Sequence, residues 1–407
     1  MQMKPLADAR VAVVLGQSAT ALFAIRELGR AGFTVYGEPG DGGPALSSRY
    51  LSQIADDTAG AVAQSDDQRL DYLLRKLPSG DSGRAVLIPC SDQDVDFVSR
   101  NAIQLGQRYA MQPALQDGTA VRLMDKESLY ALCRDQGILV PGCWTLERHE
   151  LEGLVGQLGF PCLIKPSLIH EVKQSMAGRK LWTVTSPEAY LDLIRRLPNG
   201  NTRWIVQEII PGPESEIWLY CGYFDSAGQA HQQLTARKLR QYPPGFGSAS
   251  LVRTERNDAL RKLCEDFFSA VGYRGIATAE FKRDPRDGQL RIIEVNPRPS
   301  LWFGVSSAAG KRIVLAASMD ALGQPLPDDV EARDGVYWRY LIKDIYSRLF
   351  YLFNPGFILP PPQGLKDIPV QLTAGAVYAS DDRWPVLGEL AGLVRKLLVR
   401  LFRRMTR

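Results

Sequence analysis

One short stretch, residues 279–298, constrains this chain more than any other. It reads AEFKRDPRDGQLRIIEVNPR, and its centre carries Pro285 and Gly288, residues that are typical of turns. The segment LRIIEVN that follows is rich in β-branched and apolar residues, which predicts a buried strand. The stretch therefore predicts two strands joined by a turn.

Three oxygen-bearing side chains fall within this predicted hairpin. Glu294 and Asn296 are two residues apart, so they point to the same face of their strand, and Glu280 lies on the neighbouring strand. Two carboxylates and an amide oxygen are the ligands that Mg²⁺ prefers, with phosphate oxygens completing the shell. Arg298 follows, and arginine suits the clamping of phosphate or carboxylate. A solvated hairpin with scattered charges is the alternative, but acids rarely occur inside a run such as RIIEV without a partner.

The composition is that of an ordinary globular protein. The chain has 407 residues, 45% hydrophobic and 23% charged, which is enough for two or three domains with their own cores. Six scattered cysteines without a Cys-x-x-Cys motif predict reduced core thiols in a cytoplasmic protein, and three histidines show no metal-binding spacing. We expect neither a secretory signal nor a membrane-spanning helix.

The basic residues are concentrated at one end. Residues 391–407 contain six cations and no acid, whereas the formal net charge of the whole chain is only +4. The rest of the chain is therefore close to neutral, which argues against a nucleic-acid-binding protein.

The first part of the chain alternates strands and helices. Residues 10–40 predict a β-α-β unit and residues 85–104 another strand and helix, so the region to about 115 is expected to be a small open α/β domain. Gly16 stands at a strand end, a common ligand position in such folds, although the motif is not GxGxxG and a plain turn fits equally. Asp92 and Asp94 follow another strand end and could contact a substrate, although helix capping explains Asp92 equally well.

Lysines occur where lysine is unusual. Lys126 lies near a predicted helix N-terminus, against the helix dipole, although a surface lysine is the alternative. Lys165 ends the buried strand CLIKP, where an unpaired ammonium is costly and a phosphate would satisfy it. Lys180 follows a polar loop and could add a second cation.

Residues 204–220, WIVQEIIPGPESEIWLY, predict two strands with a break between them. Gln207 and Glu208 end the first strand and suit a hinge between two lobes, where free backbone groups can pair with an adenine edge. Glu216 could bind ribose hydroxyl groups, and Glu214 is the less favoured candidate.

Further along, Arg237, Lys238 and Arg240 precede the loop PPGFGS, which predicts an anion-binding rim or a solvated basic strand. The tail has a helical spacing of apolar residues that favours a membrane-surface helix or a docking helix on its own domain or a partner. These apolar positions are 390, 393, 394, 397, 398, 401, 402 and 405.

The set Glu280, then Glu294-Val-Asn296-Pro-Arg298, resembles the magnesium-binding signature of the ATP-grasp superfamily, and the order of features agrees over about residues 10–320. The resemblance implies an ATP-grasp fold, in which two α+β lobes enclose ATP, preceded by a small open parallel α/β domain. The expected domain ranges are 1–115 for the preceding domain, 116–205 for the first lobe, 206–330 for the second lobe with the metal site, and 331–407 for a C-terminal extension.

The resemblance also implies roles for individual residues. ATP phosphates would meet lysines, with the Gln207–Ile210 hinge at the adenine, Glu216 at the ribose, and Mg²⁺ or Mn²⁺ at the two acids and the amide. The implied set is Lys126 and Lys165 for phosphate, Glu208 and the Ile210 backbone for adenine, Glu280, Glu294 and Asn296 for the metal, and Arg298 for the transferred phosphoryl group or the acyl phosphate. Lys180 and Gln207 are further candidates for contacts with ATP.

Within the superfamily, the pieces IPCSDQDVDFV, ARKLRQYPPGFGSAS and GVYWRYLIKD are similar to the carboligase group that includes D-aspartate ligase. The loop after Lys165 departs from many members because it has a single glycine. The group implies an ATP-dependent carboxylate–amine ligase that forms an amide bond through an acyl phosphate. Arg240, the 245–248 loop and Arg298 are the candidates for gripping the acid.

Two other functions remain open at this point. An ATP-grasp carboxylase, or another acyl-phosphate enzyme, would use a different nucleophile, and a membrane-held nucleotide-binding adaptor would not catalyse. The expected partners are a small-molecule acid and amine and no nucleic acid. The sequence leaves open a homodimer and a peripheral membrane contact through 390–407, which would place a cytoplasmic protein at the inner face of the membrane.

Overall fold

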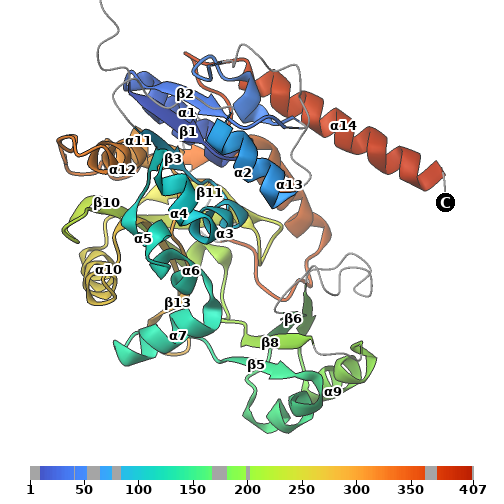
Figure 1. Cartoon of the computed structure of the whole chain (residues 1–407). Helices are drawn as coiled ribbons and strands as arrows, with labels where there is room; N and C mark the ends of the chain where they lie inside the picture. Colours follow the sequence, from blue (N-terminus) through green and yellow to red (C-terminus); the bar gives the residue numbers. More distant parts are fainter. Residues whose placement is uncertain are drawn as a thin grey trace, which may run out of the picture.

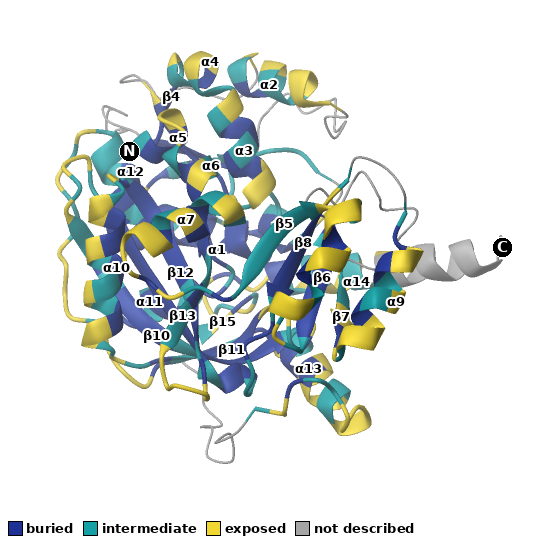
Figure 2. Ribbon diagram, turned by 90° about the horizontal axis from the view of Figure 1, so that it is seen from below, coloured by how far each residue is buried: buried dark blue, intermediate teal, exposed yellow. Residues whose placement is uncertain are grey.

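The computed structural model describes residues 10–405 apart from 41, 53–64, 76–83, 167–180, 199–201 and 363–373, and for 396–405 it describes the backbone alone. The described chain forms three sheets with helices around them (Figure 1). The sheet strands are largely buried, whereas the surrounding helices expose their outer faces (Figure 2).

The first sheet is parallel, with the strand order β2-β1-β3-β4. Continuous apolar runs such as VAVV and AVLI form its central strands, because a sheet covered on both faces has no solvated side. Ser18 caps the first helix by accepting the N–H groups of Thr20 and Ala21. The strands are β1 (Val11–Val14), β2 (Thr34–Gly37), β3 (Ala85–Ile88) and β4 (Tyr109–Ala110).

The central sheet has seven strands in the order β13-β12-β9-β10-β11-β14-β15. All neighbours are antiparallel except β14 and β15, which are parallel and fall in the range expected to be a C-terminal extension. The strands are β9 (Ile217–Phe224), β10 (Ala230–Tyr242), β11 (Ser248–Thr254), β12 (Gly275–Arg283), β13 (Leu290–Asn296), β14 (Tyr337–Arg339) and β15 (Ala374–Gly375).

The third sheet is antiparallel, with the order β5-β8-β6-β7, and lies at the end of the molecule away from the first sheet (Figure 1). It has a core of its own, in which Trp204 and Tyr190 are fully buried. The strands are β5 (Cys143–Glu147), β6 (Cys162–Pro166), β7 (Trp182–Val184) and β8 (Arg203–Glu208).

Helices fill the connections between these strands. Those of the first half are α1 (Ala19–Arg30), η1 (Pro44–Ser47), α2 (Asp66–Arg75), α3 (Asp92–Arg100), α4 (Ala102–Gly106), α5 (Pro113–Gln116), α6 (Thr119–Met124), α7 (Lys126–Asp135), η2 (Arg148–Gln157) and α9 (Pro187–Arg196). Those of the second half are η3 (Glu214–Glu216), α10 (Asp258–Ala270), α11 (Gly304–Ala308), α12 (Ile313–Ala321), α13 (Leu341–Phe353) and α14 (Pro385–Met405).

The first and central sheets share one hydrophobic core, which runs from α1 through β9 and β10 to α11 and α12. Glu27 of α1 is buried in this junction, where it accepts hydrogen bonds from the Ser307 hydroxyl and from the Leu315 N–H at 3.0 Å. Burial raises the pKa of Glu27 above its ordinary value, although these two donors favour the charged form. The first two sheets therefore form one packed unit, and the third sheet is attached to it.

Two further features bear on expectations from the sequence. All six cysteines are free, and five of them are buried. The tail forms the helix α14, and among the residues that the structure describes no helix is both long enough and apolar enough to span a bilayer.

Candidate active site

The predicted hairpin is formed by β12 and β13, which pair antiparallel. Glu280 lies directly opposite Glu294, and Thr278 lies opposite Asn296. The amide nitrogen of Asn296 donates to Glu294 Oε1 at 3.2 Å, so the two residues share a face as the strand alternation predicts. The three predicted metal ligands are thus brought together by register.

Two carboxylates facing each other repel unless a cation lies between them. Lys238 on β10 provides that cation, since its ammonium donates to Glu280 Oε2 and is 3% exposed. Burial raises the pKa of Glu280, with Lys238 opposing the shift and Glu294 adding to it. For Glu294 burial acts in the same direction, but Lys238, Lys126 and the hydrogen bond from Asn296 together lower its pKa.

These acids line a cavity of about 220 Å³ between the hairpin, the third sheet and the β10–β11 connection. Seven residues predicted for the site are in its wall, whereas Asn296, Arg298, Glu216 and Arg240 are not. The seven are Lys126, Lys165, Gln207, Glu208, Ile210, Glu280 and Glu294.

Lys126 is the first residue of α7, following the N-cap Asp125. Its ammonium donates to Gln207 Oε1 at 3.0 Å and lies 5.9 Å from the centre of the Tyr130 ring. The amide nitrogen of Gln207 in turn donates to the Tyr130 hydroxyl at 3.3 Å. Gln207 is thus held by α7 with its side chain toward the lysine.

Lys165 lies on β6, and burial lowers the pKa of its ammonium to about 8, with a smaller contribution from the nearby positive charge of Lys126. Glu294 acts against that shift without compensating it. Two lysines that face one cavity and repel each other form a site for an anion.

The hinge after β8 is held by a lysine that the sequence interpretation missed. Lys282 on β12 donates to the carbonyl oxygens of Ile210 at 2.7 Å and Gly212 at 2.9 Å. Burial lowers the pKa of Lys282 to about 8, against the attraction of nearby acids. Alternation along β12 was the available signal, because Lys282 is two residues beyond Glu280 and therefore shares its face.

The acidic residues of the hinge are already engaged. Glu208 accepts the Gly142 N–H at 3.1 Å and pairs with Arg286 at 2.5 Å. Glu216, the favoured ribose ligand, pairs with Arg237 at 3.2 Å and is not part of the cavity wall.

The less favoured Glu214 is fully buried and anchors the β10–β11 connection. It accepts the N–H groups of Gln241 at 3.1 Å and Gly245 at 2.6 Å. Burial raises its pKa, while these hydrogen bonds oppose the shift. Glu214 thus has a structural task in this arrangement.

Arg298 links the hairpin to the first sheet. Its Nε donates to Asp92 Oδ1 at 2.7 Å, and its Nη2 donates to Asn296 Oδ1 at 3.0 Å. The N-cap of α3 is Ser91, which accepts the N–H of Asp94, so the carboxylate of Asp92 is available to Arg298. Asp94 is instead bound to Arg69 at 2.6 Å inside the N-terminal domain.

Arg240 does not line the cavity and is paired within the protein. It is 5% exposed, and its guanidinium makes two hydrogen bonds to Asp344 of α13, at 2.5 and 3.1 Å. Two of its five N–H donors are therefore engaged by Asp344. The sequence could not show this, because the partner lies more than a hundred residues away. Lys180, the remaining predicted cation, lies outside the described residues.

The donor chemistry of the predicted metal set fits a hard divalent cation. Two carboxylates lie opposite each other with the Asn296 amide beside them, and Lys238 and Lys126 offset part of the charge of the buried pair. No cluster of three or more His, Cys, Asp or Glu side chains placed to hold a metal occurs within the described part of the chain. The two carboxylates and Asn296 would therefore share the metal with oxygens from a ligand or water.

Comparisons with known proteins agree with this arrangement. Residues 246–329 match the family described as the carbamoyl-phosphate synthase L chain, ATP binding domain. The crystal structure of carboxyaminoimidazole ribonucleotide synthase from Aspergillus clavatus complexed with ATP superposes with a TM-score of 0.59, at 16% identity, over 81% of each chain. The expected fold class, an ATP-grasp fold, is confirmed, and the chain is similar to members of the ATP-grasp superfamily.

Among individual relatives, D-aspartate ligase from Enterococcus faecium is 25% identical over 236 residues, which is 56% of each chain. The chain therefore matches only about half the length of this relative. The structure of an L-amino acid ligase from Bacillus licheniformis also superposes, with a TM-score of 0.53 at 15% identity, covering 81% of this chain and 78% of that one.

Proposed function

We propose that this protein is an ATP-dependent carboxylate–amine ligase that forms an amide bond through an acyl phosphate and releases ADP and phosphate. The observation that carries the proposal is the cavity in which Lys126 and Lys165 face the opposed pair Glu280 and Glu294. Cations suited to phosphates and carboxylates suited to a metal meet there at one point.

The reaction has little need for a side-chain nucleophile. A carboxylate is a poor acyl donor, and transfer of the γ-phosphoryl group makes an acyl phosphate that an amine can attack with loss of phosphate. Lys126 and Lys165 would bind the phosphate oxygens and reduce the repulsion between them and the incoming carboxylate. Arg298, beside Asn296, would stabilise the transferred group.

Glu280, Glu294 and Asn296 would hold Mg²⁺, with Mn²⁺ as the alternative ion. When bound, the metal supplies charge neutralisation and orientation for the phosphates. The hinge from Gln207 to Ile210 would receive adenine. Gly245, Phe246 and Gly247 line the same cavity and would contact the acid.

One matched relative favours the ligase over the alternatives, since it is named D-aspartate ligase. The L-amino acid ligase shares the fold. The structural likeness to carboxyaminoimidazole ribonucleotide synthase is a likeness of fold, so bicarbonate belongs in the test as a competing acid.

The test is ADP release with Mg²⁺ and ATP over a matrix of amino acids, small carboxylates, bicarbonate and amines, followed by mass spectrometry of the product. We expect ADP release that requires both an acid and an amine, and a product lighter than their sum by one water. ADP release with bicarbonate in place of an organic acid would identify a carboxylase. ATP binding without turnover for any pair would contradict the ligase and leave a nucleotide-binding adaptor.

A further inference from the structure

The last helix, α14, leaves the body of the protein after its first turns (Figure 1). Its beginning packs against η1, where Gly388 approaches closely: a Cβ there would lie 2.6 Å from Ser47 Oγ. One residue on, Glu389 accepts a hydrogen bond from the Tyr340 hydroxyl at 2.5 Å. Gly388 and Glu389 therefore define the side of α14 that faces the protein.

The opposite side presents apolar side chains to solvent. Trp384, Leu387, Leu390 and Val394 are 65, 56, 48 and 57% exposed. Their spacing of three, three and four residues places Leu387, Leu390 and Val394 on one helix face, with Trp384 where the helix begins. We call these four residues the outer stripe. In the sequence the same apolar spacing continues at 397, 398, 401, 402 and 405.

The acids of this segment are all bound to the body. Asp382 is buried and pairs with Arg26 at 2.9 Å. Asp381 accepts two hydrogen bonds from Arg30, both at 2.8 Å, and a third from the Tyr50 hydroxyl. Asp381 and Asp382 are thus each paired with an arginine of α1, and Glu389 lies on the side of α14 that faces the protein, away from the outer stripe.

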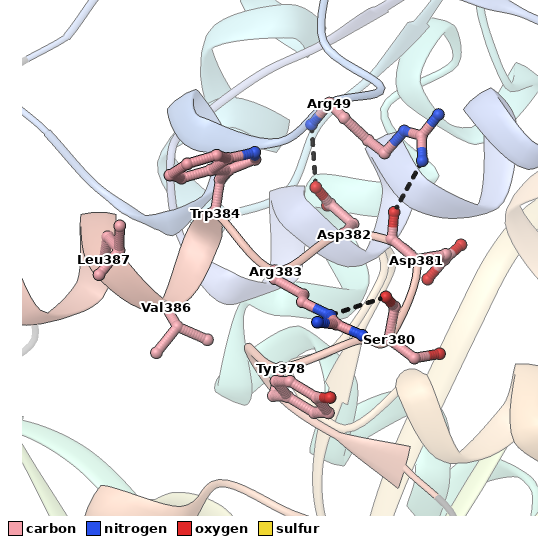
Figure 3. Close-up of a pocket in the computed structure, with 9 residues that line it drawn as sticks. All are labelled: Arg49, Tyr378, Ser380, Asp381, Asp382, Arg383, Trp384, Val386 and Leu387. Carbon is pink, nitrogen blue, oxygen red and sulfur yellow. Dashed lines mark hydrogen bonds between the residues drawn. The ribbon is translucent and has the colours of Figure 1, made fainter.

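A pocket of about 630 Å³ opens where α14 begins (Figure 3). Trp384, Leu387 and Tyr378 form part of its wall, so it is continuous with the outer stripe. Arg49 and Arg383 also line it, and their guanidinium groups donate to main-chain carbonyls, of Asp381 at 3.2 Å and Ser380 at 3.1 Å. Asp381 and Asp382 line the pocket as well, but each is paired with an arginine of α1, so the positive charge of Arg49 and Arg383 remains available to an anion.

We propose that the outer stripe and this pocket dock the protein on the surface of an anionic phospholipid bilayer. The stripe would enter the boundary between headgroups and acyl chains, where tryptophan is favoured. Arg49 and Arg383 would meet lipid phosphates. The charge of the helix fits the same surface, because residues 391–407 contain six cations and no acid.

A second copy of the chain fits this surface less well than a bilayer does. Pairing two outer stripes would bring two tails of six cations each close together, and like charges repel. An anionic bilayer satisfies the apolar stripe and the cations at once, which is the usual property of interfacial helices.

The test uses the full chain in a flotation assay. Vesicles of phosphatidylcholine alone are compared with vesicles of equal parts phosphatidylcholine and phosphatidylglycerol, at low and at high salt. We expect binding to the anionic vesicles that weakens with salt. Arg49→Gln and Arg383→Gln should each weaken it about fivefold.

The double variant Leu387→Glu/Leu390→Glu should weaken vesicle binding by about tenfold or more, because two apolar side chains that would enter the lipid are replaced by charged ones. Ile103→Glu is the matched control, since Ile103 is 84% exposed on α4 and lies outside the outer stripe. It should leave vesicle binding unchanged.

Three outcomes would overturn the proposal. The first is no binding to anionic vesicles at low salt. The second is equal binding to neutral vesicles. The third is a dimer by light scattering that Leu387→Glu/Leu390→Glu dissociates while vesicle binding persists, which would assign the stripe to a second copy of the chain.

Discussion

Two clusters of buried charge in this protein are built on different principles. At the junction between α1 and the C-terminal segment, the carboxylate of Asp382 accepts three hydrogen bonds. They come from the guanidinium of Arg26, from the Ser48 hydroxyl at 2.7 Å and from the Arg49 N–H at 2.9 Å. Arg26 also donates to the carbonyls of Val377 and Asp382, both at 2.7 Å. Every charge there faces an opposite charge or a dipole that favours it.

In the cleft, like charges face each other. Glu280 lies opposite Glu294, and Lys165 is repelled by Lys126. Lys238 is a buried cation in contact with Glu280. Such an arrangement costs stability by itself, and a ligand that carries both phosphates and a divalent cation would offset the cost. The comparison teaches that the junction holds the fold together, whereas the cleft is organised for something that binds.

The largest effect is expected at the junction. Arg26→Ala should lower the free energy of unfolding by about 3–5 kcal/mol, because it leaves the carboxylate of Asp382 buried and without its cation. Urea unfolding followed by circular dichroism measures it. Arg30→Ala is the matched control on the same helix, since its pair with Asp381 is exposed, and about 0–1 kcal/mol is expected. Equal effects of the two variants on the free energy of unfolding would contradict the contrast between a buried and an exposed ion pair.

The second prediction concerns Glu294. Glu294→Gln should reduce ATP turnover by at least about a hundredfold, since a bound metal supplies several kcal/mol of transition-state stabilisation, without reducing stability. Steady-state ADP release and thermal unfolding measure the two effects. Asp287→Asn, in the exposed turn of the same hairpin, should change neither by much. If Glu294→Gln turns over ATP about as fast as the parent protein, the assignment of Glu294 to a metal site is wrong.

The third prediction concerns Lys165, whose replacement should weaken ATP binding and stabilise the ligand-free protein. Lys165→Met should raise the KM for ATP by about tenfold to a hundredfold, because a charge-assisted contact to phosphate is lost. It should also stabilise the ligand-free protein by about 1–3 kcal/mol, because a buried ammonium with a depressed pKa destabilises the folded state. Lys262→Met, at an exposed pair, serves as the control. A loss of stability in Lys165→Met would show that this lysine is structural.

The smallest effect is a pH dependence. The pKa of Lys165 is lowered to about 8, so its ammonium is charged below that pH and loses its proton above it. Phosphate needs the charged form, so the KM for ATP should rise as pH increases through 8, by at most about tenfold per unit. Initial rates between neutral pH and mildly alkaline pH measure this rise. If the KM for ATP rises with pH in the same way in Lys165→Met, another titrating group is responsible for the rise, and Lys282 is the candidate.

The sequence by itself determined the local elements and the direction of their side chains. Turn residues and β-branched runs predicted the hairpin, and strand alternation placed Glu294 and Asn296 on one face, as the structure confirms. The alternation of strand and helix patterns predicted the α/β arrangement around the first sheet, and the spacing of the tail predicted α14. These features follow from contacts within a few residues, which is why a sequence pattern can reveal them.

The tertiary structure alone decided which charges meet. Lys238 of β10 pairs with Glu280 of β12, Arg298 pairs with Asp92 of α3, and Arg240 pairs with Asp344 of α13. A charged side chain carries no mark of its partner in the sequence, because the pairing depends on sheet order and on how helices pack over the sheet. Whether a cation is a ligand for a substrate or part of the scaffold is therefore settled by the folded arrangement around it.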